Sequence, residues 1–286
     1  MEINLGLVCM LTTTKFKRGF SGLKSLKSSA KIEDKLKKAC LHNIEETIKC
    51  INWCINNKIF LYRVSSEVIP FNEFWSWKDE IDILKGLNKI QNLALKNKII
   101  LTIHPDQFCV LNSLNEKVVN NSIKILEYHY ELSLFLGIKH IILHTGSSVY
   151  EYESRFFETC SKLNKNILDK LCLENCHNIN ILSVINICKK LKIKPLIDFH
   201  HNRICGNVNI DSILSEILEL WNNKKPLAHL SSGKNFSNDK KHNDFILKED
   251  IIEFEKYFYK FNVEIEAKQK EIAILKVKSF FNLLKN

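Results

Sequence analysis

PLIDFHH, residues 195–201, joins a short apolar run to an abrupt polar end. Its first three residues predict a buried strand, and Asp198, His200 and His201 follow directly. A strand that ends in an Asp-x-x-His pair places a carboxylate and an imidazole at one strand end, where metal-dependent α/β enzymes gather their ligands. The same pattern taken alone is also typical of a turn with a hydrogen-bonded histidine, so its meaning depends on whether it recurs.

The pattern recurs in a strict alternation of strands and helices. Apolar runs predict eight strands, at 3–9, 58–64, 98–103, 139–143, 170–173, 195–197, 226–229 and 262–265. Helical periodicity follows each strand, at 31–57, 77–97, 115–137, 153–166, 181–191, 210–221, 249–258 and 270–284. Alternating β and α units predict a parallel sheet, and eight of them predict a closed (β/α)₈ TIM barrel. Because no linker or composition break divides residues 1–286, we expect a single domain.

Composition favours a cytoplasmic protein. The 286 residues are 45% hydrophobic, which supports a full core, and no window approaches the roughly 18 consecutive apolar residues of a membrane span. The start of the chain lacks the basic and apolar regions of a secretory signal. Ten cysteines contain no CxxC pair and lie in apolar strands or helices, so we interpret them as reduced core residues.

Positive charge suggests a nucleic-acid partner. The formal net charge is +10, and nine Lys and Arg residues fall between Lys15 and Lys38, among them Lys17 and Arg18. Phe16 and Phe20 are interleaved with these residues, so the loop from 12 to 29 could meet phosphates and offer rings to unstacked bases. AT-rich coding bias would explain the charge equally simply, and a solvated flexible loop would explain the segment.

Metal-ligating side chains close six consecutive predicted strands, from the third to the eighth. They are His104, His144, Glu174, Asp198 together with His201, His229 and Glu266. The carboxyl ends of barrel strands converge on one rim, and side-chain alternation points these residues into the barrel. Buried charges on this scale need partners, and divalent ions such as Zn, Mn or Fe would supply them. The ligands exceed the needs of one ion, so we expect two or three, an arrangement suited to in-line displacement at phosphorus.

The remaining histidines do not share this position. His42 and His129 fall in the middle of predicted helices, where we expect a surface location. His140 lies at the opposite end of its strand. His177 and His200 adjoin predicted ligands and are candidates for supporting them.

Seven motifs together resemble the UV damage endonucleases, a family of metal-dependent (β/α)₈ barrels related to the endonuclease IV type of abasic-site nuclease. The motifs are YRVSSEVIPF (62–71), LTIHPDQF (101–108), ILHTG (142–146), LENCH (173–177), DFHH (198–201), AHLSS (228–232) and EAKQKE (266–271). They occur in order from the second predicted strand to the last. The resemblance therefore covers nearly the whole chain.

The resemblance implies a DNA repair enzyme that incises duplex DNA immediately 5′ of a UV photoproduct, leaving 3′-OH and 5′-phosphate ends for excision repair. It carries the seven strand-end residues over as metal ligands and adds His242, in the loop after the seventh strand. Glu174, which would bridge two ions, and Glu266 are the expected catalytic carboxylates. The implied cofactors are two or three divalent ions, with Mn²⁺ expected and Zn²⁺, Mg²⁺ or Co²⁺ as alternatives. We expect a monomer that binds damaged double-stranded DNA.

Lesion-probing residues are also implied. Gln107 and Phe108 match the Gln-Tyr pair that family members push into the duplex where the damaged nucleotides flip out, and Phe keeps the stacking surface of that pair. Lys268, beside the last ligand, matches a basic position that could meet phosphate. Lys15, Lys17 and Arg18 would grip the DNA backbone on the same rim.

Three positions depart from the family pattern. Leu227 replaces a Lys that can be carboxylated and bridge metals, which puts a third ion in doubt. Leu7 replaces a lesion-contacting Tyr, and Asp106 replaces the Gly of the probe loop. Three other functions stay open: an abasic-site nuclease, a sugar isomerase of the xylose type, and a barrel that binds damaged DNA without cutting it. An isomerase gives no reason for the basic loop or for Gln107 and Phe108.

Overall fold

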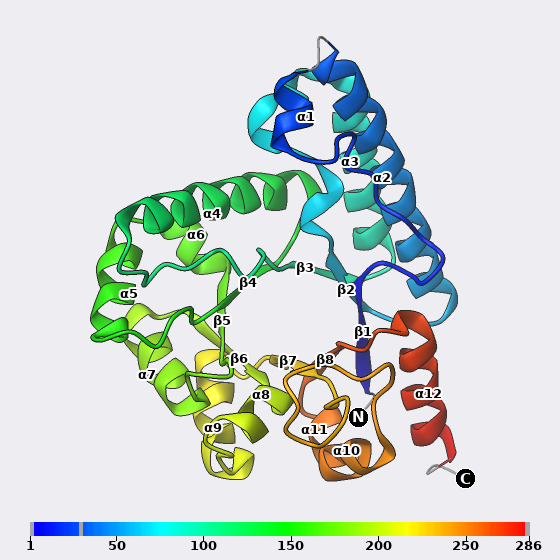
Figure 1. The fold of residues 1–286 in the computed structure, drawn as a ribbon. Helices are drawn as coiled ribbons and strands as arrows, with labels where there is room; N and C mark the ends of the chain where they lie inside the picture. The colour runs from blue at the N-terminus through cyan, green and yellow to red at the C-terminus, as the bar shows by residue number, and fades with distance from the viewer. Residues whose placement is uncertain (1–2, 29–30, 284–286) are drawn as a thin grey trace.

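Eight parallel strands close into a barrel at the centre of the molecule (Figure 1). The computed structural model describes residues 3–28 and 31–283. The strands are β1 (Asn4–Cys9), β2 (Leu61–Val64), β3 (Ile100–Ile103), β4 (His140–His144), β5 (Leu171–Glu174), β6 (Lys194–Asp198), β7 (Leu227–Leu230) and β8 (Asn262–Ile265). Each strand pairs with the next in sequence, and β1 pairs with β8. The predicted (β/α)₈ barrel is confirmed.

Helices surround the barrel and cover the outer face of its sheet (Figure 1). They are α1 (Leu23–Lys27), α2 (Ile32–Asn56), α3 (Ile81–Lys96), α4 (Glu116–Leu136), α5 (Tyr152–Ser161), α6 (Lys165–Lys170), α7 (Ile181–Leu191), α8 (Phe199–Ile204), α9 (Ile210–Leu220), α10 (Lys248–Glu253), α11 (Glu255–Phe258) and α12 (Lys270–Leu283). Within the described residues, every helix is too short or too polar to cross a lipid bilayer.

The strand register brings the predicted site residues to one level of the barrel. His144 on β4 stands opposite Glu174 on β5, and Asp198 on β6 stands opposite His229 on β7. Because both pairs lie at the carboxyl ends of their strands, their side chains converge on the rim that the alternation of strands and helices predicts.

Polar caps set several helix boundaries. Asn115, Asn180 and Asn209 each accept a backbone N–H hydrogen bond from the first turn of the helix that follows. Gly137, with φ of +68°, ends α4 in the left-handed conformation that glycine adopts without strain.

Three segments differ from the predicted elements. The helix predicted over 153–166 is interrupted, because Asn164 caps a new helix, α6, through the N–H of Asn166. The helix predicted over 249–258 divides into α10 and α11 at Phe254. A short helix, α8, begins directly after Asp198, where the sequence pattern predicts a loop. Ser29 and Leu284, predicted ends of the basic loop and the last helix, lie outside the described residues.

The basic segment after β1 is held against α2. Asn43, fully buried, accepts a hydrogen bond from the N–H of Lys17 (2.7 Å) and donates one to its carbonyl (2.9 Å). The carboxylate of Glu46 accepts from the N–H of Lys15 at 3.0 Å. Phe20 is buried and packs edge-on against Phe71. The prediction that its ring could stack with bases is therefore wrong. Phe16 is half-buried.

Candidate metal centre

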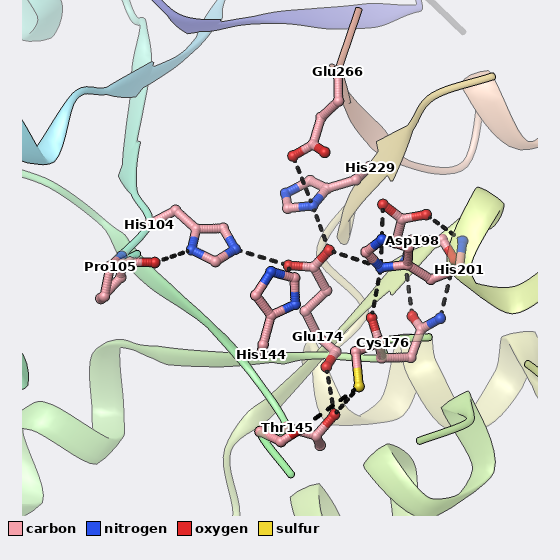
Figure 2. A network of polar contacts seen from close by, with 12 residues as sticks. His104, Pro105, His144, Thr145, Glu174, Cys176, Asp198, His201, His229 and Glu266 are labelled. Atoms are coloured by element: carbon pink, nitrogen blue, oxygen red, sulfur yellow. Dashed lines mark hydrogen bonds and ion pairs between the residues drawn. The ribbon is translucent and has the colours of Figure 1, made fainter. Parts of the chain in front are cut away.

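Glu174 lies at the middle of a ring of four histidines (Figure 2). Its Oε2 is 2.9 Å from His104 Nε2 and 3.5 Å from His144 Nδ1. Its Oε1 is 2.9 Å from His229 Nδ1 and 3.5 Å from His201 Nδ1. Each oxygen of this buried carboxylate therefore faces its own pair of histidines, one pair from β4 and the residue after β3 and the other from β7 and α8.

Asp198 ties the centre to the end of β6. One carboxylate oxygen, Oδ1, accepts the backbone N–H of His201 (2.7 Å) and so caps α8. The backbone of Asp198 is held by the buried side chain of Asn175, which accepts its N–H (2.8 Å) and donates to its carbonyl (3.1 Å). The second oxygen, Oδ2, lies 3.6 Å from His201 Nδ1.

These side chains fit divalent ions. The side chains form three overlapping groups, and within each group the ligand atoms lie within 4.8 Å of one another. The groups are His104, His144 and Glu174; Glu174, Asp198 and His201; and Asp198, His229 and Glu266. Two of those atoms, Asp198 Oδ2 and His144 Nδ1, are buried without a hydrogen-bond partner among the described residues. A buried polar atom without a partner is costly, and an ion would satisfy both. The groups could therefore hold metal ions, as imidazole and carboxylate ligands together suit Zn, Mn or Fe.

The charges of the centre depend on one another. Burial opposes ionisation of Glu174, but the surrounding histidines, His144 and His229 first, lower its pKa well below the usual range. Burial raises the pKa of Asp198 and lowers the pKa of His144 to about 4. At His229 burial acts downward, but the neighbouring carboxylates, Glu174 first, raise the pKa to about 10. An ion held by His229 would compete with a proton for the ring, so its binding would tighten as the pH rises.

Two charged residues next to this ring, Arg63 and Glu264, were not predicted as site residues from the sequence. Arg63 on β2 is 5% exposed, and its guanidinium contacts Glu264, Glu266 and His229. Glu264 on β8 is fully buried and accepts a hydrogen bond from Thr102 Oγ1 (2.5 Å). Side-chain alternation already places Glu264 on the same face as Glu266, and the position of Arg63 inside a short apolar strand is a comparable signal.

Several other histidines support the centre or lie far from it. His200 is fully buried, and its Nε2 lies 2.9 Å from the carbonyl of Asp239. The ring of His177 packs edge-on against His201 with centroids 4.3 Å apart. The expected surface location of His129 is wrong: it is 4% exposed, with Nε2 3.0 Å from Ser66 Oγ, because α4 packs this face against the loop after β2. His42 is half-buried, and His140 lies at the first residue of β4, away from the rim.

His242 lies beside the centre. Its Nδ1 is 3.8 Å from Glu266 Oε2, and its ring is 29% exposed. It lies outside the three compact ligand groups of the described residues. The loop that carries it is fixed by a bridge to Gly233 and by the contact of His200 with Asp239.

A cavity of about 410 Å³ opens over the ligands. Gln107, His144, His201, His242 and Glu266 are among the residues that line it. The cavity therefore joins one predicted probe residue to the predicted ligands.

The turn at residues 106–109, which carries the predicted probe residues Gln107 and Phe108 and is called the probe turn below, is shaped by Asp106, one of the three residues that depart from the family pattern. Asp106 Oδ1 accepts the backbone N–H of Phe108 at 2.8 Å, and its carbonyl accepts that of Cys109 at 3.1 Å. This Asx-type turn presents Phe108 with 70% of its surface exposed. Asp106 thus supplies with its side chain the tight turn that a glycine would otherwise allow.

The predicted DNA-contacting cations are exposed. Lys15, Lys17, Arg18 and Lys268 all have exposed side chains. Arg18 lies 5.1 Å above the ring of Phe71 and lines a second cavity, of about 210 Å³, with Ser66 and Asp106, so it lies near the probe turn. Leu7 and Leu227 are buried in the core.

The sequence comparisons identify one family, and the structural comparisons include it. The sequence model of the UV-endonuclease UvdE family matches residues 3–285. The chain is 31% identical over 300 residues to the UV DNA damage endonuclease of Nostoc sp., a match that covers 97% of this chain and 90% of that protein. The crystal structure of SacUVDE superposes with a TM-score of 0.88 at 28% identity and covers 100% of both chains. Endonuclease IV from Thermus thermophilus shares the fold, with a TM-score of 0.62 at 10% identity over 98% of this chain and 99% of that one.

Proposed function

We propose that this chain, which belongs to the UV DNA damage endonuclease family, is a DNA repair nuclease that uses divalent ions to incise duplex DNA 5′ of UV photoproducts. The products would be 3′-OH and 5′-phosphate ends, and the protein would act as a monomer. Membership in this family favours a nuclease over a sugar isomerase. The ion dependence, the position of the cut and the lesion specificity are the parts that we add.

The placement of Glu174 carries the proposal. Its two oxygens face separate histidine pairs, at 2.9 and 3.5 Å on each side, so this carboxylate would help to hold ions on both sides. When bound, divalent ions would activate water and neutralise the charge that develops on the leaving oxygen of a phosphodiester. His104, His144, Asp198, His201, His229 and Glu266 would hold them, with His242 as a further ligand.

The protein's own groups would position the substrate. Phe108, exposed at the tip of the probe turn, offers a ring for stacking in the space that extruded nucleotides leave. Gln107 lines the cavity over the ligands, so the same turn reaches both the duplex and the reacting centre. Lys15, Lys17, Arg18 and Lys268 would bind the phosphate backbone.

The test is incision of a labelled duplex that carries one cyclobutane dimer. We expect a single cut 5′ of the dimer with Mn²⁺, and loss of cutting with EDTA or after Glu174→Gln. Equal cutting of the undamaged duplex would exclude lesion recognition. Glu271→Gln, which changes a buried carboxylate outside the centre, is the matched control and should cut normally.

The same assay separates the remaining alternatives. An abasic-site nuclease would cut a duplex with a single abasic analogue and spare the dimer. A non-cleaving binder would retain the damaged duplex in a salt-sensitive complex without incision under any of Mn²⁺, Zn²⁺, Mg²⁺ or Co²⁺.

A further inference from the structure

We propose that Arg63 and Glu264 form a charged layer beneath the metal centre that positions His229 and Glu266 for an ion. The inference rests on the proposed function, because it assumes that these two ligands hold a divalent cation. It assigns a task to two buried residues that the ligand groups do not include; Arg63 falls within the motif at 62–71, where it was given no role, and Glu264 falls outside the motifs.

Arg63 is the structural link of the layer. Its Nε donates to Glu264 Oε2 at 2.6 Å, and its Nη1 lies 2.6 Å from Glu266 Oε1. Arginine offers five N–H donors in a rigid planar fork, so it can hold both carboxylates in fixed positions at once. Glu266 Oε2 is left on the side of His242 and the cavity.

Glu264 explains the orientation of His229. The ring directs Nδ1 toward Glu174 (2.9 Å) and Glu266 (3.4 Å), and Nε2 toward Glu264 Oε2 (3.1 Å). A neutral ring that offers Nδ1 to an ion carries its hydrogen on Nε2. In the structure Nε2 lies 2.6 Å from Nη2 of Arg63, which can only donate, so Nε2 accepts this hydrogen bond and the ring hydrogen lies on Nδ1, toward Glu174. If Nδ1 bound an ion, the hydrogen would move to Nε2, where Glu264 Oε2, 3.1 Å away, could accept it. Carboxylates in this position fix the ring of a metal-bound histidine and increase its basicity.

Thr102 completes the layer from a third strand. Its Oγ1 donates to Glu264 Oε1 at 2.5 Å, and both residues are fully buried. The two oxygens of Glu264 therefore have separate partners, one shared by Arg63 and His229 and the other bound to Thr102. This arrangement prevents the carboxylate from rotating away from His229.

Stability alone does not account for the layer. Buried ion pairs can often be replaced by apolar residues of similar volume without loss of stability, whereas removing one partner is strongly destabilising. Arg63 and Glu264 could therefore have been apolar, as Leu227 and other interior residues are. Their proximity to two predicted ligands points to the ion as the reason for their charge.

The experiment separates a positioning role from a structural one. The double variant Arg63→Met/Glu264→Met removes both charges and should unfold in urea close to the wild-type free energy. Its affinity for Mn²⁺, measured by calorimetry on the full chain, should fall about 10- to 100-fold for one ion of the set. Glu264→Gln should weaken the same ion, and Thr102→Val, a near-isosteric change that should fold, should weaken it a few-fold.

Controls and contrary outcomes are distinct. Glu271→Gln, whose carboxylate binds the N–H and hydroxyl of Thr12, should lower stability and leave Mn²⁺ affinity unchanged. Wild-type Mn²⁺ affinity and stoichiometry in the double variant or in Thr102→Val would overturn the positioning role. Absence of Mn²⁺ binding by the wild-type chain would instead contradict the proposed ion dependence, so the two failures are distinguishable.

Discussion

At the scale of single residues, the pattern of strand ends predicts where the site residues lie better than it predicts which side chains they contact. Alternation and the end of each strand predict that His104, His144 and Glu174 converge, and the structure brings them together. Arg63 was missed because a cation inside a strand is explained only when its carboxylate partners, 201 and 203 residues further along the chain, are known. His129 was misplaced for the same reason, since its hydroxyl partner lies on another element.

Stability should depend on pH through His140. Burial lowers its pKa to about 3, with Lys194 and Lys170 adding to the effect. In the unfolded chain the His140 imidazole binds a proton near pH 6.5, whereas in the folded chain it stays neutral at that pH. The free energy of unfolding therefore decreases as the pH falls below about 6.5. The loss is about 1.4 kcal/mol per pH unit for one such group. His140→Phe should remove this part of the slope in urea unfolding between pH 6.5 and 5 with EDTA present. Above pH 7 the two proteins should show parallel profiles, and an unchanged acid slope would contradict the expectation.

Phe108 should matter for damaged DNA and not for folding. Stacking of one base on an aromatic ring contributes about 1–3 kcal/mol. Phe108→Ala should therefore lower kcat/KM on a dimer-containing duplex by roughly 5- to 150-fold, while Phe108→Tyr should retain it. Because the ring is 70% exposed, the melting temperature should not change. Phe60→Ala is the control, since Phe60 precedes β2 at the opposite end of the barrel and is 42% exposed. Equal rates for Phe108→Ala and wild type would exclude the probe role.

At the scale of elements, helix caps decide where the sequence pattern is misleading. Hydrophobic periodicity runs through Asn164 and Phe254 without a visible stop, but α5 ends at Ser161 before Asn164 starts α6, and Phe254 both ends α10 and starts α11. Helix α8 was missed because it has only six residues, too few for a periodic pattern. Its start was nevertheless encoded by Asp198, an ordinary N-cap residue whose metal-ligand interpretation obscured its second role.

The basic segment after β1 should determine the salt dependence of DNA binding. Asn43 and Glu46 fix its backbone, so its exposed cations should meet phosphates without a large ordering cost. Each phosphate contact adds about 0.9 to the slope of log affinity against log salt. Changing Lys15, Lys17 and Arg18 to Gln should reduce the slope by up to about 3 in fluorescence anisotropy with a labelled duplex.

The control for that measurement uses cations at the other end of the barrel. Lys96, Lys224 and Lys260 are exposed and precede β3, β7 and β8. Changing these three to Gln lowers the net charge equally but should leave the slope nearly intact. Equal effects of the two triple variants would mean that overall charge, rather than the segment, binds the DNA.

At the scale of the whole molecule, the barrel was predictable because the sequence patterns that indicate it are spread along the entire chain. Eight apolar runs with intervening helices specify the fold even when several boundaries are displaced by a few residues. The ion count was not predictable in the same way, because it depends on distances of tenths of an ångström among ligand atoms from six strands and their loops.

Ion binding should stabilise the entire barrel. The proposed ligands come from β3 to β8 and the segments that follow them, so unfolding must release every ion. An ion at 100 times its dissociation constant adds about 2.7 kcal/mol to the free energy of unfolding. Mn²⁺ should therefore raise the melting temperature, and EDTA should reverse the rise. Glu174→Gln should lose most of the shift, whereas Glu271→Gln should keep it. A shift of equal size in both variants would place the stabilising ion elsewhere.

The cap at Asp198 also constrains how this protein can change over time. One of its oxygens caps α8 and the other faces His201, so a single side chain is both a helix cap and a candidate metal ligand. Asparagine would preserve the cap and remove the charge, and glutamate would preserve the charge and misplace the cap. Neither conservative substitution at position 198 keeps both properties, so the helix cap and the candidate metal ligand are retained together only by aspartate.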